Sequence, residues 1–156
     1  MPVSATSLDV FDRTLQATNV WLNQIMEFVG PDRHVAWHVL GSVLRTLRDR
    51  LPLGLAAHLG AQLPLLVRGL YYDQWRPSDE PQKWRSLEEF LALVSVDLRD
   101  LRPVNPTDGA RAVFSVLNHF IDPGQIEKVR EALPEDVRRI WPESKPRAGD
   151  GMGSGA

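Results

Sequence analysis

The 156-residue sequence contains no cysteine. This absence excludes disulfide bonds, thiolate metal sites, iron–sulfur clusters and cysteine nucleophiles, and it suits a chain that works in a reducing compartment. Long hydrophobic runs are also missing, because no stretch reaches the roughly 18 uncharged apolar residues that a membrane span needs. The first residues lack the basic and apolar regions of a signal peptide. We therefore expect a soluble, cytoplasmic protein that does not bind a membrane.

The sequence also has little net charge. Its 18 lysines and arginines and 20 aspartates and glutamates leave a formal charge of −2 at pH 7, and the sequence pI is about 6.1. A dedicated binder of nucleic acid usually shows a basic face or a high pI, so this balance argues against such a partner. With 43% apolar and 24% charged residues, the composition is that of one ordinary globular domain and not of a disordered or fibrous chain.

Apolar residues recur at alternating steps of three and four along most of the chain, which is the pattern of amphipathic helices. The first stripe consists of Leu8, Phe11, Leu15, Thr18, Leu22, Ile25 and Val29. It predicts one long helix, capped by Thr6 or Ser7 and ended by the pair Gly30-Pro31. Thr18 is the polar member of the stripe, and we expect its hydroxyl to bond to a backbone carbonyl one turn earlier.

Further helices follow from their capping residues. Asp32 is a suitable N-cap for a second helix that ends near Pro52. Two short helices should come next, the later one with Leu66, Leu70 and Tyr71 on its buried side. After a polar stretch that contains prolines, Ser86 opens a capping box, and four more helices are expected between it and residue 142.

The second half of the chain repeats the pattern of the first. Residues 42–71 align without a gap on residues 112–141, and about two identities would be expected by chance. The identical pairs are Val43 and Val113, Leu47 and Leu117, Gly54 and Gly124, Leu63 and Leu133, Pro64 and Pro134, Val67 and Val137, and Arg68 and Arg138. We therefore predict an all-α fold of about eight helices, arranged as two tandem, internally homologous four-helix units that share one core.

The same alignment sets the expected domain boundaries. The first helical repeat covers residues 6–75, a linker covers residues 76–85, and the second repeat covers residues 86–142. Residues 143–156 are rich in glycine and are expected to form a disordered tail. They are not a phosphate-binding loop, because no Lys-Ser or Lys-Thr pair follows the glycines and no strand precedes them.

Three segments and one tryptophan of the first half carry a family resemblance. They are Arg48-Asp49-Arg50-Leu51-Pro52, Leu59-Gly60-Ala61-Gln62-Leu63-Pro64, Val67-Arg68-Gly69-Leu70-Tyr71-Tyr72 and Trp75. These segments resemble a bacterial family catalogued as domain of unknown function 2267, and the pattern from Ser86 to Pro134 is similar to the second repeat of that family. The resemblance implies an all-helical, bacterial, cytoplasmic protein. It implies no reaction, ligand or catalytic residue.

Aromatic residues and arginines gather at the end of the first half. This cluster consists of Arg68, Tyr71, Tyr72, Trp75, Arg76 and Trp84. Such a composition suits a surface that binds another protein or a second copy of the chain, and it can also stack bases and hold phosphates. A structural alternative is that Tyr71 and one tryptophan close the seam between the repeats while the arginines cap carbonyls or pair with acids. Acidic residues mixed through the cluster argue against nucleic acid.

His34 and His38 form a second candidate site. They lie four residues apart on the predicted second helix, so both can point to one side, as ligands of a transition metal do. A metal site needs at least a third ligand, and the equivalent positions of the second repeat hold Val104 and Asp108. Histidines that face solvent are the alternative. A separate anion site near the end of the same helix would consist of Arg45, Arg48 and Arg50.

No catalytic motif is recognisable in the sequence. It has no Gly-x-Ser-x-Gly elbow, no glycine-rich dinucleotide loop, no Walker lysine and no His-Glu-x-x-His. We therefore expect neither enzyme activity nor a cofactor, and we predict a small, non-catalytic protein-interaction or regulatory module. The alternatives are a helical bundle that binds a metal or small ligand and, less favoured, a nucleic-acid-binding protein.

Overall fold

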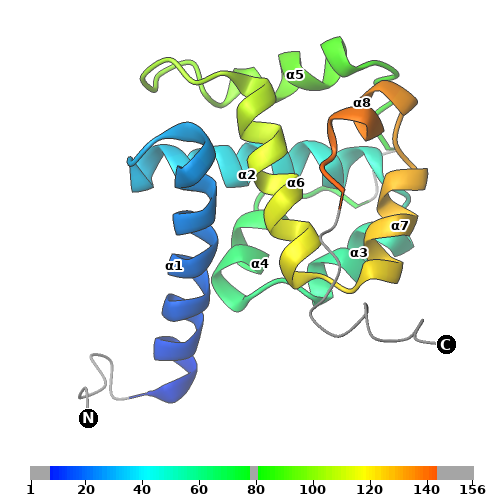
Figure 1. Cartoon of the computed structure of the whole chain (residues 1–156). Coiled ribbons are helices and arrows are strands. Elements are labelled where there is room, and N and C mark those ends of the chain that lie inside the picture. Colours follow the sequence, from blue (N-terminus) through cyan, green and yellow to red (C-terminus); the bar gives the residue numbers. More distant parts are fainter. Residues whose placement is uncertain (1–7, 78–80, 144–156) are drawn as a thin grey trace, which may run out of the picture.

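The computed structural model describes residues 8–77 and 81–143. Within these ranges the chain forms eight α-helices and no strand, which confirms the predicted fold class (Figure 1). None of the described helices is both long and apolar enough to cross a membrane. The helices are α1 (Asp9–Val29), α2 (Arg33–Arg50), α3 (Leu53–Ala61), α4 (Leu65–Tyr72), α5 (Leu87–Val96), α6 (Pro106–Phe120), α7 (Pro123–Glu131) and α8 (Glu135–Ile140).

Several helix ends follow from single residues. The carboxylate of Asp32 accepts a hydrogen bond from the backbone N–H of His34 at 3.0 Å, and the hydroxyl of Ser86 accepts one from Glu89 at 3.1 Å. Both caps confirm the predicted starts of α2 and α5. Gly30 ends α1 with a φ of 101°, a conformation that a residue with a Cβ adopts only with strain. The N-cap expected at Thr6 or Ser7 and nearly all of the predicted tail lie outside the described residues.

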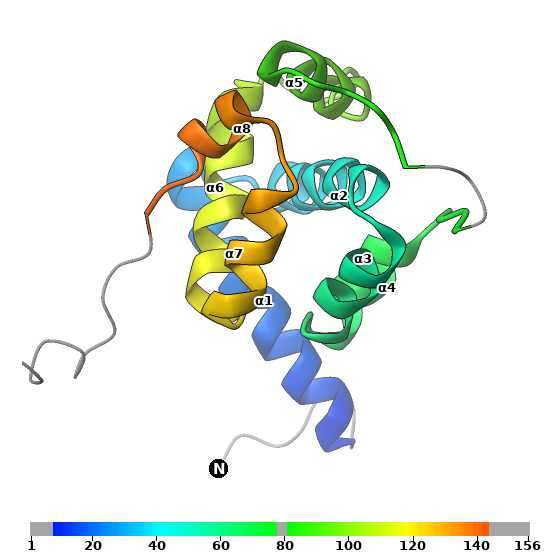
Figure 2. The same cartoon turned by 90° about the vertical axis from the view of Figure 1, so that its right-hand side faces the viewer.

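Two central helices, α2 and α6, contact most of the other helices. Helix α1 packs along α6 and also contacts α2 and α4, while α5 crosses α2 and also contacts α6 and α8. Helices α3 and α7 contact each other, so that α1–α4 and α5–α8 meet across one apolar core. Figure 2 shows α2 nearly end-on between α5 and the pair α3 and α4. The organisation as two homologous units stays a prediction from the sequence.

A row of aromatic rings runs through the part of the core that belongs to the second half. Trp84 packs against Phe90 with ring centroids 5.0 Å apart, Phe90 stacks on Phe114 at 6.0 Å, and Phe114 stacks on Trp141 at 4.0 Å. All four residues are buried. Large buried rings contribute much of the apolar area of a small domain, so this row fastens the predicted linker and the end of α8 to α5 and α6.

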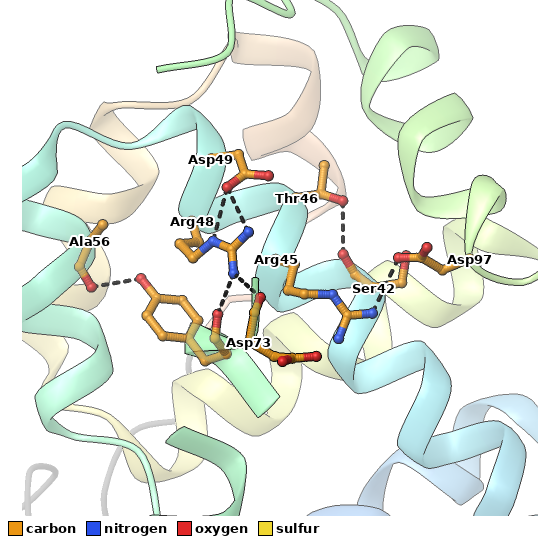
Figure 3. A network of polar contacts seen from close by, with 9 residues as sticks. Ser42, Arg45, Thr46, Arg48, Asp49, Ala56, Asp73 and Asp97 are labelled. Carbon is orange, nitrogen blue, oxygen red and sulfur yellow. Dashed lines mark hydrogen bonds and ion pairs between the residues drawn. The ribbon is translucent and has the colours of Figure 1, made fainter. Parts of the chain in front are cut away.

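Polar side chains of α2 bind the second half (Figure 3). The hydroxyl of Ser42 is fully buried and donates to the carbonyl oxygen of Val94 near the end of α5, at 2.7 Å. The predicted linker is also bound to α2, because the N–H of Gln82 donates to the carbonyl oxygen of Asp49 at 2.6 Å. These bonds satisfy carbonyl groups in the last turns of α5 and α2, which have no helical donor of their own, and they fix residues 82–94 on the first half.

Burial at the start of α1 and in α4 differs from the expectation, because Leu8, Phe11 and Leu15 of the predicted stripe are exposed. Thr18 does donate to the carbonyl oxygen of Thr14, at 2.6 Å, as predicted. Leu66, however, is exposed, and the prediction that it lies on the buried side of α4 is wrong. Helix α4 instead buries Val67 and Tyr71, while Leu66 lies beside the start of α1, where that helix runs past the other helices of the bundle (Figure 1).

Candidate functional site

A cleft of about 440 Å³ opens where α2 and α4 end. Trp75, Pro77 and Pro81 supply apolar walls, together with one leucine at the end of α2 and one at the start of α3, and Asp49 and Arg76 supply charged groups. A volume of this size lies within the range of about 300–1,000 Å³ that is typical of ligand pockets. Apolar walls with few charged groups suit the binding of a partly apolar ligand.

The floor of the cleft is the buried side chain of Arg48, which is 5% exposed. Its Nη1 donates to the carbonyl oxygens of Tyr71 and Asp73, each at 2.8 Å, while Nε and Nη2 donate to Oδ1 of Asp49 at 2.9 and 2.8 Å. Figure 3 shows the guanidinium between Asp49 and the end of α4. A buried charge is stable only when it is paired and hydrogen-bonded, and this arrangement provides both while capping α4.

The three arginines of the possible anion site, Arg45, Arg48 and Arg50, do not converge on a common position. Arg45 pairs with Asp97 at 3.2 Å, across the contact between α2 and α5. Arg50 donates from Nε to the carbonyl oxygen of Trp84 at 3.0 Å and lies over the ring of the same residue, 5.6 Å from its centroid. Since Arg48 is occupied by Asp49, the three arginines bind three different partners within the chain.

Two aromatic residues of the predicted cluster, Tyr71 and Trp84, are buried. The hydroxyl of Tyr71 donates to the carbonyl oxygen of Ala56 at 2.6 Å, and burial raises the pKa of this phenol well above its usual value. Trp84 packs against Phe90, so neither predicted contact residue offers its ring to a partner in this structure. Both residues are part of the buried core, whereas their predicted role in closing a seam between two repeats stays a prediction.

Arg68 also has a structural role. Its guanidinium donates to the carbonyl oxygens of Gly60 at 3.0 Å, Ala61 at 3.1 Å and Leu63 at 3.0 Å. These carbonyls lie at the end of α3, where the backbone has no further helical donors. Arg68 thus caps α3, which is the role the sequence allowed for an arginine that recurs in both halves.

Tyr72, Trp75 and Arg76 remain accessible to a partner. Tyr72 and Trp75 are half-buried and stack with ring centroids 5.3 Å apart, and Arg76 is exposed. Gln74 has a φ of 58°, an uncommon value for a residue other than glycine, and it turns the chain after α4. This turn brings the Trp75 ring back onto Tyr72 and places Trp75 in the wall of the cleft.

The comparison with known families identifies the chain. The model of a family described as Uncharacterized conserved protein (DUF2267) matches residues 18–140, most of the sequence. The chain belongs to the DUF2267 family. The resemblance found in the sequence is therefore confirmed, and the matched residues of the DUF2267 model include the whole cleft. No curated protein shows significant similarity to the chain.

The histidine pair of this DUF2267 protein is close but lacks a third ligand. The rings of His34 and His38 meet edge to face with centroids 4.5 Å apart, and His34 is exposed. Among residues 8–77 and 81–143, no three histidine, cysteine, aspartate or glutamate side chains are grouped so that they could hold a metal ion. A structural or catalytic zinc site usually has three or four protein ligands, so the described residues provide no such site at these histidines.

Some residues of the cleft were not predicted from the sequence. Leu53 and Gln82 line it although neither belongs to the aromatic cluster, and Asp49 belongs only to a segment that resembles the family. They come from α2, the start of α3 and the predicted linker. The Arg48-Asp49 pair within the motif was the one available signal, since adjacent opposite charges near a helix end often bind each other.

Proposed function

We propose that this DUF2267 protein is a non-catalytic interaction module of the cytoplasm that holds an extended segment of a partner protein in the α2–α4 cleft. The observation that carries the proposal is the position of the half-buried Trp75 ring beside the exposed guanidinium of Arg76 in one cleft. Aromatic rings and arginines are the residue types that contribute most to binding energy in protein interfaces.

The chemistry of the cleft favours a partner segment that is both apolar and acidic. Among the described residues, the lining contains Arg48, Arg76 and one acid, Asp49, so two positive charges and one negative charge leave a net charge of +1. Arg48 is already neutralised by Asp49 at 2.8 Å, and Arg76 is the cation that lies at the surface. A carboxylate of the partner can pair with Arg76 while an apolar neighbour covers Trp75.

Selection from a displayed library of short random peptides tests this function. We expect the wild-type protein to enrich peptides that combine an acidic residue with an aromatic or aliphatic one. Changing Trp75→Ala together with Arg76→Glu should weaken binding of the selected peptides at least about tenfold, since loss of an interface anchor costs about 1–2 kcal/mol or more. Arg111→Glu, which introduces the same charge change on exposed α6 surface outside the cleft, should leave their affinity unchanged.

The helical circular-dichroism signal of both variants must match that of the wild type, because Trp75 and Arg76 lie outside the buried core. Enrichment of peptides without acidic residues would contradict the predicted partner chemistry. Equal affinity of the selected peptides for the wild type and the double variant would show that they bind elsewhere.

A further inference from the structure

The first turns of α1 leave an apolar face uncovered. Further along the helix, Trp21, Leu22 and Ile25 are buried in the core. The start of the helix runs past its neighbours (Figure 1), and apolar residues there are exposed to solvent. Successive residues are about 100° apart around a helix, so Val10, Phe11 and Leu15 surround Thr14 on the side that faces the core.

The start of α4 extends this apolar surface. The backbone N–H of Leu66 donates to the hydroxyl of Thr14 at 3.1 Å, which places the first residues of α4 beside the uncovered turns of α1. We call the resulting surface the α1–α4 patch, and each of its side chains is between 40% and 54% exposed. The patch consists of Leu8, Val10, Phe11, Leu15, Leu65 and Leu66.

The repeat predicted from the sequence does not account for these turns. When the alignment of the two repeats is extended towards the N-terminus, Ala17 falls on Leu87, the first residue of α5. Helix α1 therefore begins with a segment, residues 9–16, that α5 lacks. The DUF2267 match begins at residue 18, after the same segment. An apolar stripe continued for about two turns beyond what the fold covers needs another partner.

We propose that the α1–α4 patch binds a second copy of this chain, with the first turns of α1 from two copies packed antiparallel about a two-fold axis. The alternating steps from Leu8 to Phe11 and from Phe11 to Leu15 are the heptad spacing with which helices pair. A two-fold interface must be complementary to itself, and a patch made only of apolar side chains meets that requirement without like charges facing each other.

The charged residues of this segment support the same partner. Asp9 and Arg13 pair with each other along α1, 3.8 Å apart, on the solvent side of the helix. A surface specialised for a different protein usually sets its partner through charges around an apolar centre. Here these two charges pair with each other on the solvent side, which leaves an apolar centre suited to an identical helix.

The size of the patch fits a weak but specific dimer. Six half-exposed large apolar side chains amount to a surface on the order of 500 Å², the size at which an exposed apolar patch marks an interaction site. Two patches placed face to face would remove about 1,000 Å² from water, close to the lower bound for a specific interface. The dimer should therefore dissociate on dilution.

Sedimentation and native mass spectrometry over a range of protein concentrations test the proposal. We expect the wild-type mass to rise from 17.6 kDa towards twice that value as concentration increases. Leu15→Glu should weaken self-association at least about tenfold, because the interface would bury an unpaired carboxylate. Val20→Glu is the matched control, since Val20 is 44% exposed and Leu15 is 43% exposed on the same helix, about 140° apart around it.

A cross-link gives a second readout that does not depend on a destabilising charge. Because the chain has no cysteine, a single Phe11→Cys change creates one thiol near the proposed two-fold axis. Mild oxidation should convert this variant to a disulfide-linked dimer much faster than Val20→Cys.

Three results would overturn the proposal. The first is a wild type that remains monomeric at the highest concentration reached. The second is equal weakening of self-association by Leu15→Glu and Val20→Glu. The third is faster cross-linking of Val20→Cys than of Phe11→Cys. None of them bears on peptide binding in the cleft, which uses other residues.

Discussion

Arg48 on α2 and Asn118 on α6 align with each other in the two predicted repeats. Both bind backbone carbonyls after the last helix of their half, but with different chemistry. Arg48 donates to the carbonyl oxygen of Tyr71 at 2.8 Å, and its charge is compensated by Asp49. Asn118 donates from Nδ2 to the carbonyl oxygen of Pro142 at 2.6 Å without needing a counter-ion. The same position thus satisfies the carbonyls at the end of a helix in both halves, and a charged residue brings an acid with it.

The aromatic residues beside Arg48 and Asn118, which we call the two anchors, also differ in how they are held. Tyr71 closes the first half through a hydrogen bond from its hydroxyl to Ala56. Trp141, its equivalent in the second half, stacks on Phe114 with an interplanar angle of 7° and donates to Oδ1 of Asn118 at 2.7 Å. The first half therefore depends on a charge and on an ionisable phenol, whereas the second depends on stacking and neutral amide bonds. The charged anchor also forms the floor of the cleft.

Replacing the two anchors should show the largest difference between the halves. Arg48→Ala leaves Asp49 and two carbonyls without their donor, and we expect a loss of about 3–4 kcal/mol in the free energy of unfolding. Asn118→Ala leaves one carbonyl and the indole N–H of Trp141 without partners, with an expected loss of about 1–2 kcal/mol. Urea unfolding followed by circular dichroism measures both values. Equal losses would mean that the charge of Arg48 makes its removal no more costly than that of Asn118. The two halves would then not differ in this respect.

The place where the two halves touch each other directly offers the next test. Val39 on α2 and Gly109 on α6 are also equivalent in the extended alignment, and a Cβ added at Gly109 would lie 3.0 Å from Cγ1 of Val39. Equivalent positions thus face each other at the crossing of the central helices, and one of them must be small. Gly109→Val should cost about 2 kcal/mol of stability through overpacking.

The exchanged pair sharpens this test. Val39→Gly combined with Gly109→Val moves the large residue to the other helix, so the double variant should be more stable than Gly109→Val alone. The single variant Val39→Gly supplies the fourth corner of the cycle and should lose stability through the cavity and the glycine in a helix. If the two losses simply add in the double variant, these side chains do not compete for the same space.

The sequence predicted the helices because their ends depend on local chemistry. Asp32 and Ser86 cap α2 and α5 with their own side chains, and each can be recognised from a few neighbouring residues. Burial was harder to predict. The apolar stripe of α1 continues evenly from Leu8 to Val29, yet Leu8 and Phe11 are exposed because the bundle covers only the later turns. How far the neighbouring helices cover α1 depends on the assembled fold, so the apolar stripe alone cannot predict it.

The cleft was predictable only in part for a similar reason. Composition drew attention to Trp75 and Arg76, but it could not separate them from Tyr71 and Trp84, which are buried. Which of these rings are buried depends on how they face the core, and for Trp75 this is set by the turn of the chain at Gln74, after α4. Residues from distant segments then complete the lining, and they come together only through contacts such as the hydrogen bond from the predicted linker to the end of α2.

Tyr71 gives the smallest expected effect and the one that depends on pH. Tyr71→Phe removes the hydrogen bond to the carbonyl oxygen of Ala56 and should cost about 1 kcal/mol near neutral pH. Burial raises the pKa of the phenol in the folded state. The folded protein therefore keeps a proton that the unfolded chain releases above its pKa of about 10, and stability falls as the pH rises through that value.

Unfolding by urea at a series of alkaline pH values should consequently show a decline for the wild type that Tyr71→Phe lacks, so that the difference between them shrinks as the pH rises. Trp141→Phe is the control in the second half, because it removes the bond to Asn118 but no ionisable group. This variant should start lower and decline in parallel with the wild type. If Tyr71→Phe declines as steeply as the wild type, the alkaline sensitivity belongs to another group, and the first half is not distinguished from the second by its buried phenol.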